Sequence, residues 1–272
     1  MFNPSFKSKF DKEVVDYSKL EKSKSLFGVW KKKQDFLTLC AQTSEAFQAV
    51  MKQHGFQTSG TFYAECHAFL TMCKLLDVDV ILESGMSRGN STEIWAKNFH
   101  GKIVTFENMK QDYHDDVVNR LSPYDIDINF EDSNRGFKQK LKQLKDSRVA
   151  VFIDGPKDVH AVQLALESFK FSNVLFVGIH DVANPITKCR AHYGFMKYFK
   201  YHVLSTDELE FREKFAFLDD DISDPDGAWV YNESGVSSHS SDPKAILERF
   251  PQGPGIGIAL NQNLNLDDQF NL

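Results

Sequence analysis

Residues 80–92, with the sequence VILESGMSRGNST, join a short apolar run to a turn that contains two glycines. The apolar run predicts a strand that ends at Leu82 or Glu83, because continuous Val, Ile and Leu are typical of strands buried on both faces. Gly85 permits backbone conformations closed to other residues and allows a ligand to approach the chain. Gly89 is expected to open a helix, whose free N–H groups and dipole favour an anionic ligand. The segment therefore predicts strand, turn and helix around a ligand site.

A second strand and a terminal acid extend this pattern. Residues 103–107 have the sequence IVTFE, so Glu107 ends the next predicted strand, 22 residues after Gly85. In dinucleotide-binding folds an acid about 20 residues after the turn accepts hydrogen bonds from the ribose hydroxyls. The turn lacks the third glycine of the NAD pattern and the Gly-Lys-Ser/Thr of a P-loop, which disfavours NAD and excludes a P-loop. The alternative is an ordinary turn beside a surface acid.

The rest of the chain alternates between apolar runs and amphipathic stretches. Strands are predicted at residues 78–82, 103–106, 126–130, 149–153 and 174–179. Helices are predicted near residues 90–98, 110–121, 135–145, 159–170 and 186–199. This alternation predicts an α/β fold with a doubly wound, mostly parallel, Rossmann-like sheet. Later candidate strands are residues 201–204, 228–231 and 256–260, and predicted loops are residues 219–227 and 232–244.

Three regions are expected along the chain. Residues 1–60 are predicted as an N-terminal helical extension that acts as a lid, residues 61–260 as the Rossmann-like domain, and residues 261–272 as a flexible tail. The helical extension could also pair two copies of the chain, so a homo-oligomer remains an open alternative.

Composition restricts the partners and the compartment. The net charge of -6 argues against nucleic acid as the main partner. No apolar run approaches the ~18 residues needed to span a membrane, and no apolar segment follows Met1 as in a signal peptide. The four cysteines fit no zinc-binding spacing. We therefore expect a cytoplasmic protein with no membrane partner and no nucleic-acid partner.

The glycine turn also resembles a known sequence motif. Its form, E-x-G-x-x-x-G-x-S-T over residues 83–92, is similar to motif I of class I S-adenosylmethionine-dependent methyltransferases. It is most similar to the small-molecule O-methyltransferases of the type 24 group, which have cephalosporin-hydroxylase-like proteins as neighbours. The resemblance covers residues 62–205 and is specific at residues 80–107 and 149–155. It implies a Rossmann-like fold of the methyltransferase type and S-adenosylmethionine as the cofactor.

The resemblance also implies roles for individual residues. Glu83, Gly85 and Gly89 would cradle the methionine part of the cofactor, and Glu107 would hold the ribose. Asp132 and Ser133 would lie near the adenine, although a helix cap is an equal alternative for Asp132. The complete set expected to bind the cofactor is Glu83, Ser84, Gly85, Met86, Gly89, Ser91, Thr92, Glu107, Asn108, Asp132, Ser133 and Asp154.

Two further strands end in titratable residues. Asp154 follows the strand at residues 149–153, and His180 and Asp181 follow the strand at residues 174–179. Ligands of open α/β sheets bind beyond the carboxyl ends of the strands, so these three candidate catalytic residues should converge near the cofactor.

Three roles remain open for this group. Asp154 and Asp181 could bind Mg²⁺, as the resemblance to catechol-type methyltransferases implies, but Val182 stands where those enzymes have an amide, and Asn184 comes two residues later. His180 could act as a general base, or His180 and Asp181 could be a structural pair.

The leading interpretation is therefore an enzyme. We expect an S-adenosylmethionine-dependent methyltransferase that acts on an oxygen of a small molecule or sugar. The alternatives are a cephalosporin-hydroxylase-like enzyme on the same scaffold and a non-catalytic subunit that binds a nucleotide-like ligand.

Overall fold

The computed structural model of the chain describes residues 25–54, 61–156, 159–182, 196–206, 208–219, 228–231, 237–240 and 255–271. Most of the predicted helix at residues 186–199 lies outside these ranges, as do residues 1–24 of the predicted N-terminal extension. Asn184 is likewise outside the described part of the chain.

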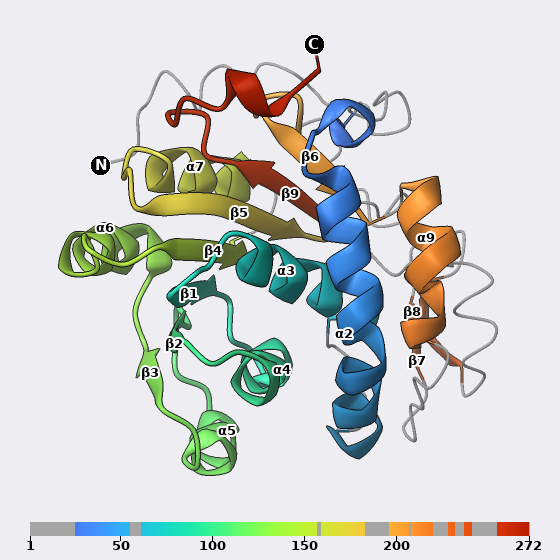
Figure 1. Ribbon diagram of the computed structural model, residues 1–272. Helices are drawn as coiled ribbons and strands as arrows, with labels where there is room; N and C mark the ends of the chain where they lie inside the picture. Colours follow the sequence, from blue (N-terminus) through green and yellow to red (C-terminus); the bar gives the residue numbers. More distant parts are fainter. Residues whose placement is uncertain are drawn as a thin grey trace.

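A seven-stranded sheet with the order β3-β2-β1-β4-β5-β9-β6 forms the centre of the molecule (Figure 1). Its strands are β1 (Val80–Ser84), β2 (Lys102–Phe106), β3 (Ile126–Asn129), β4 (Val149–Ile153), β5 (Val174–His180), β6 (His202–Ser205) and β9 (Ile256–Leu260). Strands β1 to β5 are parallel, whereas β9 runs antiparallel between β5 and β6. This is a doubly wound, mostly parallel, Rossmann-like sheet, so the predicted α/β fold is confirmed.

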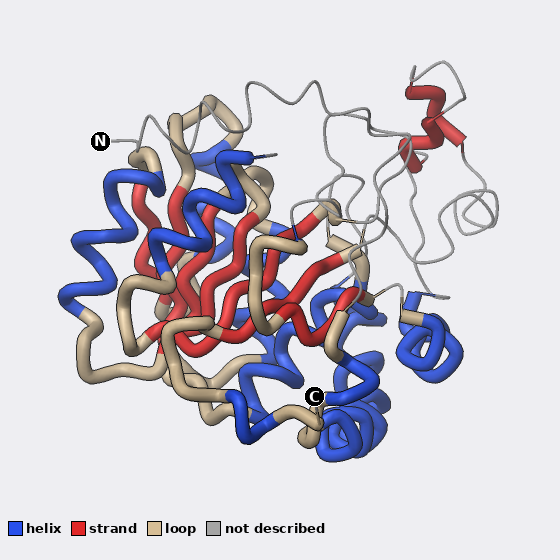
Figure 2. Tube along the Cα trace, turned by 90° about the horizontal axis from the view of Figure 1, so that it is seen from above, coloured by secondary structure: helices blue, strands red, loops and turns tan. Residues whose placement is uncertain are grey.

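Helices cover both faces of this sheet (Figure 2). The longer ones are α2 (Lys33–His54), α3 (Tyr63–Leu75), α4 (Asn90–Asn98), α5 (His114–Leu121), α6 (Ser133–Gln143), α7 (Val159–Ser168) and α9 (Leu209–Phe215), and the short ones are η2 (Phe27–Val29), η3 (Ala216–Asp219) and η4 (Asp267–Gln269). Successive side chains of a strand point to opposite faces. In β1, Ile81 packs with α2, α3 and α4, while Val80 and Leu82 pack with α6 and α7. The apolar runs are therefore strands buried on both faces, as predicted.

The strand order reverses at β1. The chain moves from β1 outward to β2 and β3, and then returns to β4 on the other side of β1. Ligands of open α/β sheets bind at such a switch point, beyond the carboxyl ends of the strands. The residues that follow β1 and β4 here are the glycine turn and Asp154, so the fold brings the two predicted half-sites together.

Two predictions about the end of the chain are wrong. Residues 261–271 are not a flexible tail, because Phe270 is buried, its ring stacks on Tyr201, and Asn271 N–H donates to the Val29 carbonyl. Part of the predicted loop at residues 232–244 is strand β8 (Ser237–Ser240), which pairs antiparallel with β7 (Ala228–Tyr231). Aromatic packing and strand pairing override the polar composition of both segments.

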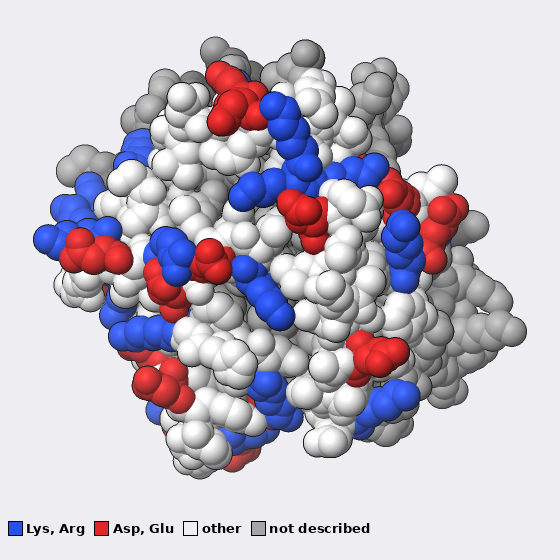
Figure 3. Space-filling view, viewed as in Figure 1, with Lys and Arg blue, Asp and Glu red and all other residues white. Residues whose placement is uncertain are grey.

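The surface mixes charges of both signs. Figure 3 shows acidic and basic side chains interspersed over one face of the described chain. Arg148, for example, pairs with Asp77 and Asp79 beside β1. Among the described helices, none combines the length and the apolarity that crossing a membrane requires.

Gly85 gives a direct test of how closely the turn packs against the end of β4. Its φ of 92° is strained for other residues, and an added Cβ would lie 2.5 Å from the Gly155 backbone nitrogen at the end of β4. We expect Gly85→Ala to lower the free energy of unfolding by about 1–3 kcal/mol, measured by chemical denaturation. The control is Gly28→Ala, where an added Cβ would meet nothing within 4 Å. Equal stabilities of the two variants would contradict this close packing of Gly85 against Gly155.

Candidate functional site

Glu83 lies at the end of β1 and is completely buried. Its Oε1 accepts hydrogen bonds from Ser91 Oγ at 2.6 Å and from Trp95 Nε1 at 2.9 Å. Its Oε2 accepts from Thr92 Oγ1 at 2.5 Å and from Thr105 Oγ1 at 2.8 Å. Burial raises the pKa of Glu83, and the four donors act against that shift.

These contacts change the roles expected for three residues. A carboxylate has about four lone-pair positions, and here each is taken by a donor of the protein. Glu83 is therefore a structural tie between β1, β2 and the first turn of α4, instead of a group that contacts the methionine part of a ligand. Ser91 and Thr92, expected to bind the cofactor, point their hydroxyls at Glu83 instead.

Glu107 follows β2 and is only half-buried, with its side chain facing the glycine turn. Its Oε2 accepts from Ser87 N–H at 2.7 Å, and its Oε1 accepts from Asn108 N–H at 3.1 Å. Each oxygen thus holds one backbone donor and keeps acceptor capacity for a further donor. This geometry suits the recognition of two neighbouring hydroxyl groups.

The loop after β3 approaches the turn from a third strand. Asp132 is the N-cap of α6, since its Oδ1 accepts from Asn134 N–H at 2.9 Å. The capping alternative for Asp132 is therefore confirmed. The neighbouring Ser133 is buried, and its Oγ lies 2.7 Å from the Oγ of Ser84 at the end of β1.

Three more of the expected residues lie in or beside the turn. Met86 is buried in a small apolar cluster with Val117 and Leu121 of α5. Asn108 is exposed and contributes its backbone N–H to Glu107. Gly89 has a φ of 74° and is the N-cap of α4, so the prediction that it opens this helix is confirmed.

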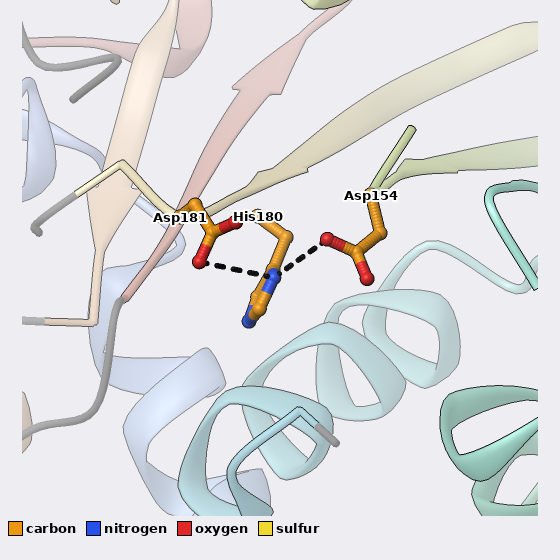
Figure 4. Close-up of side chains that lie close together, drawn as sticks. All are labelled: Asp154, His180 and Asp181. Carbon is orange, nitrogen blue, oxygen red and sulfur yellow. Dashed lines mark hydrogen bonds and ion pairs between the residues drawn. The ribbon is translucent and has the colours of Figure 1, made fainter. Parts of the chain in front are cut away.

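Asp154, His180 and Asp181 converge at the ends of β4 and β5 (Figure 4). His180 Nδ1 lies 2.8 Å from Asp154 Oδ1 and 3.6 Å from Asp181 Oδ1. On its other side, His180 Nε2 lies 2.9 Å from Oε2 of Glu65 in α3. An imidazolium, which donates from both ring nitrogens, matches the carboxylate oxygens on its two sides.

The electrostatics agree with this protonation state. Burial acts to lower the pKa of His180, but Asp154, Asp181 and Glu65 outweigh it and raise that pKa well above its ordinary value. Burial raises the pKa of Glu65, while His180 and the Gly255 N–H act to lower it. An imidazolium has no lone pair with which to take a substrate proton, so these contacts favour a structural and electrostatic role for His180 over the general-base role.

The same arrangement bears on the expected metal ion. The potential ligand atoms of Asp154, His180 and Asp181 lie within 4.8 Å of one another. However, Mg²⁺ prefers oxygen ligands, and the imidazolium already provides a cation for the carboxylates. Val182, at the position of the amide in catechol-type enzymes, is a buried apolar residue that adds no ligand. The described residues do not fit a Mg²⁺ site.

Glu65 is a site residue that the sequence analysis missed. It lies in α3, which is buried almost all round. An acid in such a helix needs a partner, because an unpaired buried charge is very costly. Glu65 has two, since its Oε1 also accepts from Gly255 N–H at 2.7 Å. The apolar residues Ala64, Ala68 and Met72 were the signal that could have identified it.

Comparisons with known proteins give likenesses of fold. No protein-family model and no curated protein matches the sequence. Among solved structures, the O-methyltransferase TomG from Streptomyces achromogenes, in complex with SAM, is 14% identical, with a TM-score of 0.38, 91% of this chain covered and 94% of that chain. An O-methyltransferase from Bacillus cereus with SAH is 15% identical, with a TM-score of 0.37 and coverages of 84% and 91%. The SAH-bound methyltransferase PaMTH1 from Podospora anserina is 12% identical, with a TM-score of 0.37 and coverages of 95% and 96%. At these values the likenesses add nothing to the site, which its own contacts describe.

The imidazolium of His180 predicts a pH dependence of stability. Since folding raises its pKa, its contribution to the free energy of unfolding is complete below the unfolded pKa of about 6.5 and is lost as the pH rises through the folded pKa. We expect the stability difference between the wild type and His180→Gln to be largest near pH 6 and to shrink at higher pH. Denaturation at several pH values measures it. A difference that is constant or grows with pH would show that His180 is neutral.

Proposed function

We propose that the chain binds S-adenosylmethionine at the glycine turn and transfers its methyl group to an oxygen of a small molecule or sugar. The observation that carries this proposal is the convergence of the Gly85 turn, Glu107 and Asp154 at the switch point of the sheet. On one side of this point, the carboxylate of Glu107 can accept hydrogen bonds from hydroxyl groups. On the other side, the carboxylates around His180 provide negative charge. A cationic nucleoside with a free ribose has the matching chemistry.

Glu107 and the turn would hold the nucleoside. The carboxylate of Glu107 keeps acceptor capacity on both oxygens, which matches the two ribose hydroxyls. The loop of Asp132 and Ser133 lies beside the turn and would border the adenine. Gly85 would let the ligand approach the backbone closely.

The acidic group opposite would face the reacting end of the cofactor. When bound, S-adenosylmethionine supplies an electrophilic methyl group on a positively charged sulfur. Three carboxylates, of Glu65, Asp154 and Asp181, surround the single cation of His180, so the group carries excess negative charge when all three acids are ionised. Such a field favours a cationic ligand beside it.

Asp154 would receive the proton of the acceptor hydroxyl. Its side chain is 22% exposed, compared with 7% for His180 and 4% for Asp181, so a substrate can reach it most easily. In the proposed transfer, the methyl carbon would leave the sulfur, which becomes neutral, for the acceptor oxygen, and Asp154 would take the hydroxyl proton. His180 holds Asp154 in place through Oδ1. Orientation of the two reactants would supply most of the rate enhancement.

Ligand binding gives the first test of this proposal. We expect S-adenosylhomocysteine to raise the unfolding temperature, by an amount that corresponds to about 2.7 kcal/mol at 100 times its Kd, and NAD to have no effect. Glu107→Ala should abolish the shift because the ribose acceptor is lost. The control is Glu167→Ala, which removes an exposed acid of α7.

Each contrary outcome of this experiment has a clear meaning. No shift of the wild type with S-adenosylhomocysteine would refute the proposed function. A shift with NAD alone would indicate a dinucleotide site. A full shift in Glu107→Ala would refute the assignment of Glu107 to the ribose.

The contacts of Asp154, His180 and Asp181 predict that the proposed methyl transfer needs no Mg²⁺. Adding Mg²⁺ or a chelator should leave the unfolding temperature unchanged, with or without S-adenosylhomocysteine, because His180 already neutralises part of the acidic group. The matched variant is Asp181→Asn, which removes one carboxylate and keeps its shape. Stabilisation of the wild type by Mg²⁺ that is lost in Asp181→Asn would contradict this account.

A further inference from the structure

Ser87 is the one residue of the glycine turn that is held in a left-handed conformation without being glycine. Its φ is 46°, between Gly85 at 92° and Gly89 at 74°. A non-glycine residue in this region is strained and persists only where its surroundings impose it. The contacts of its two peptide groups show what imposes it here.

Both backbone polar groups of Ser87 are held by side chains. Its N–H donates to Glu107 Oε2 at 2.7 Å, and its carbonyl oxygen lies 3.0 Å from Nε2 of His114. The two side chains come from different elements, because Glu107 follows β2 and His114 begins α5. Ser87 is thus the link between them.

The protonation of His114 follows from its contacts. The Gln111 N–H donates to His114 Nδ1 at 2.7 Å, so this nitrogen carries a lone pair. The hydrogen of the neutral ring is therefore on Nε2 and is donated to the Ser87 carbonyl. His114 is fully buried, with its ring between Tyr113 and Phe130, which fixes its orientation. The ring is a rigid donor in a single tautomer.

Glu107 depends on this arrangement for its orientation. One of its oxygens is held by the Ser87 N–H and the other by the Asn108 N–H, which leaves one acceptor position on each oxygen. A change in the Ser87 backbone torsions, which link its carbonyl to its N–H, would release Oε2 and turn the carboxylate. Its two remaining acceptor positions would then no longer be presented together.

We propose that His114 is a positioning residue for recognition of the ribose diol. It acts through the Ser87 backbone on Glu107 and does not touch the ligand. This inference rests on the proposed function, since it assigns the diol to Glu107. It differs from a purely structural role for a buried histidine. It predicts that a substitution that removes the Nε2 donor of His114 lowers the affinity for the ligand only where the ligand has its ribose hydroxyl groups.

Two conservative variants separate the two contacts of the ring. His114→Gln places an amide nitrogen near the position of Nε2 and keeps the donor to Ser87. His114→Asn places an amide oxygen near the position of Nδ1, keeping the acceptor for Gln111 and losing the donor. The ligands are S-adenosylhomocysteine and its analogue without the two ribose hydroxyls, with Kd measured by calorimetry on the full chain.

We expect His114→Asn to weaken S-adenosylhomocysteine binding about tenfold, or about 1.4 kcal/mol, and His114→Gln to stay within about threefold of the wild type. Removing the two ribose hydroxyls from the ligand should weaken its binding to the wild type and to His114→Gln. The same removal should weaken binding to His114→Asn much less. Nitrogen NMR of the ligand-free wild type should show hydrogen on Nε2 of His114, whether or not the Asn variant folds.

The outcomes distinguish this inference from the proposed function. No binding of S-adenosylhomocysteine to the wild type would overturn both. Binding to the wild type with an equal hydroxyl effect in His114→Asn would overturn the positioning role alone, even if that variant bound more weakly overall. Hydrogen on Nδ1 of His114 would also overturn it.

Discussion

The buried carboxylate of Glu83 is the interaction on which the site depends. Taking a charge out of water is costly unless it is fully hydrogen-bonded, and here four hydroxyl and indole donors surround it. These donors come from α4 and β2, whereas Glu83 itself lies in β1, one residue before its end. The contacts therefore fix where the helix begins relative to two strands. The glycine turn spans the gap between Glu83 and α4, so its shape follows from this tie.

On the other side of the site, buried charges are likewise paired with partners. Glu65, Asp154 and Asp181 lie around His180, which is held as a cation by their charge. This second group joins α3 to the ends of β4 and β5, and Glu65 also reaches the start of β9 through Gly255. Two buried acids, Glu83 and Glu65, thus anchor the two sides of the switch point. The more exposed acids, Glu107 and Asp154, are the ones that we propose for the ligand and its acceptor.

The sequence predicted the elements and the position of the site well, because both depend on local patterns. Apolar runs such as residues 149–153 were strands at the predicted bounds, and Asp154 and His180 lay where strand ends must meet. The roles of Glu83, Glu65 and His114 were not predictable in this way. Each depends on partners far along the chain, such as Thr105 for Glu83 and Gly255 for Glu65. The packing of Phe270 on Tyr201 escaped prediction for the same reason.

A crystal structure of the chain with S-adenosylhomocysteine would test the central claim most directly, namely that the exposed acids bind the ligand and the buried acids build the site. We predict both ribose hydroxyls within hydrogen-bond distance of the Glu107 carboxylate, the ligand sulfur on the side of Asp154, and the four donors still on Glu83. A ligand bound away from the switch point, or one that contacts Glu83 directly while Glu107 faces solvent, would contradict the account.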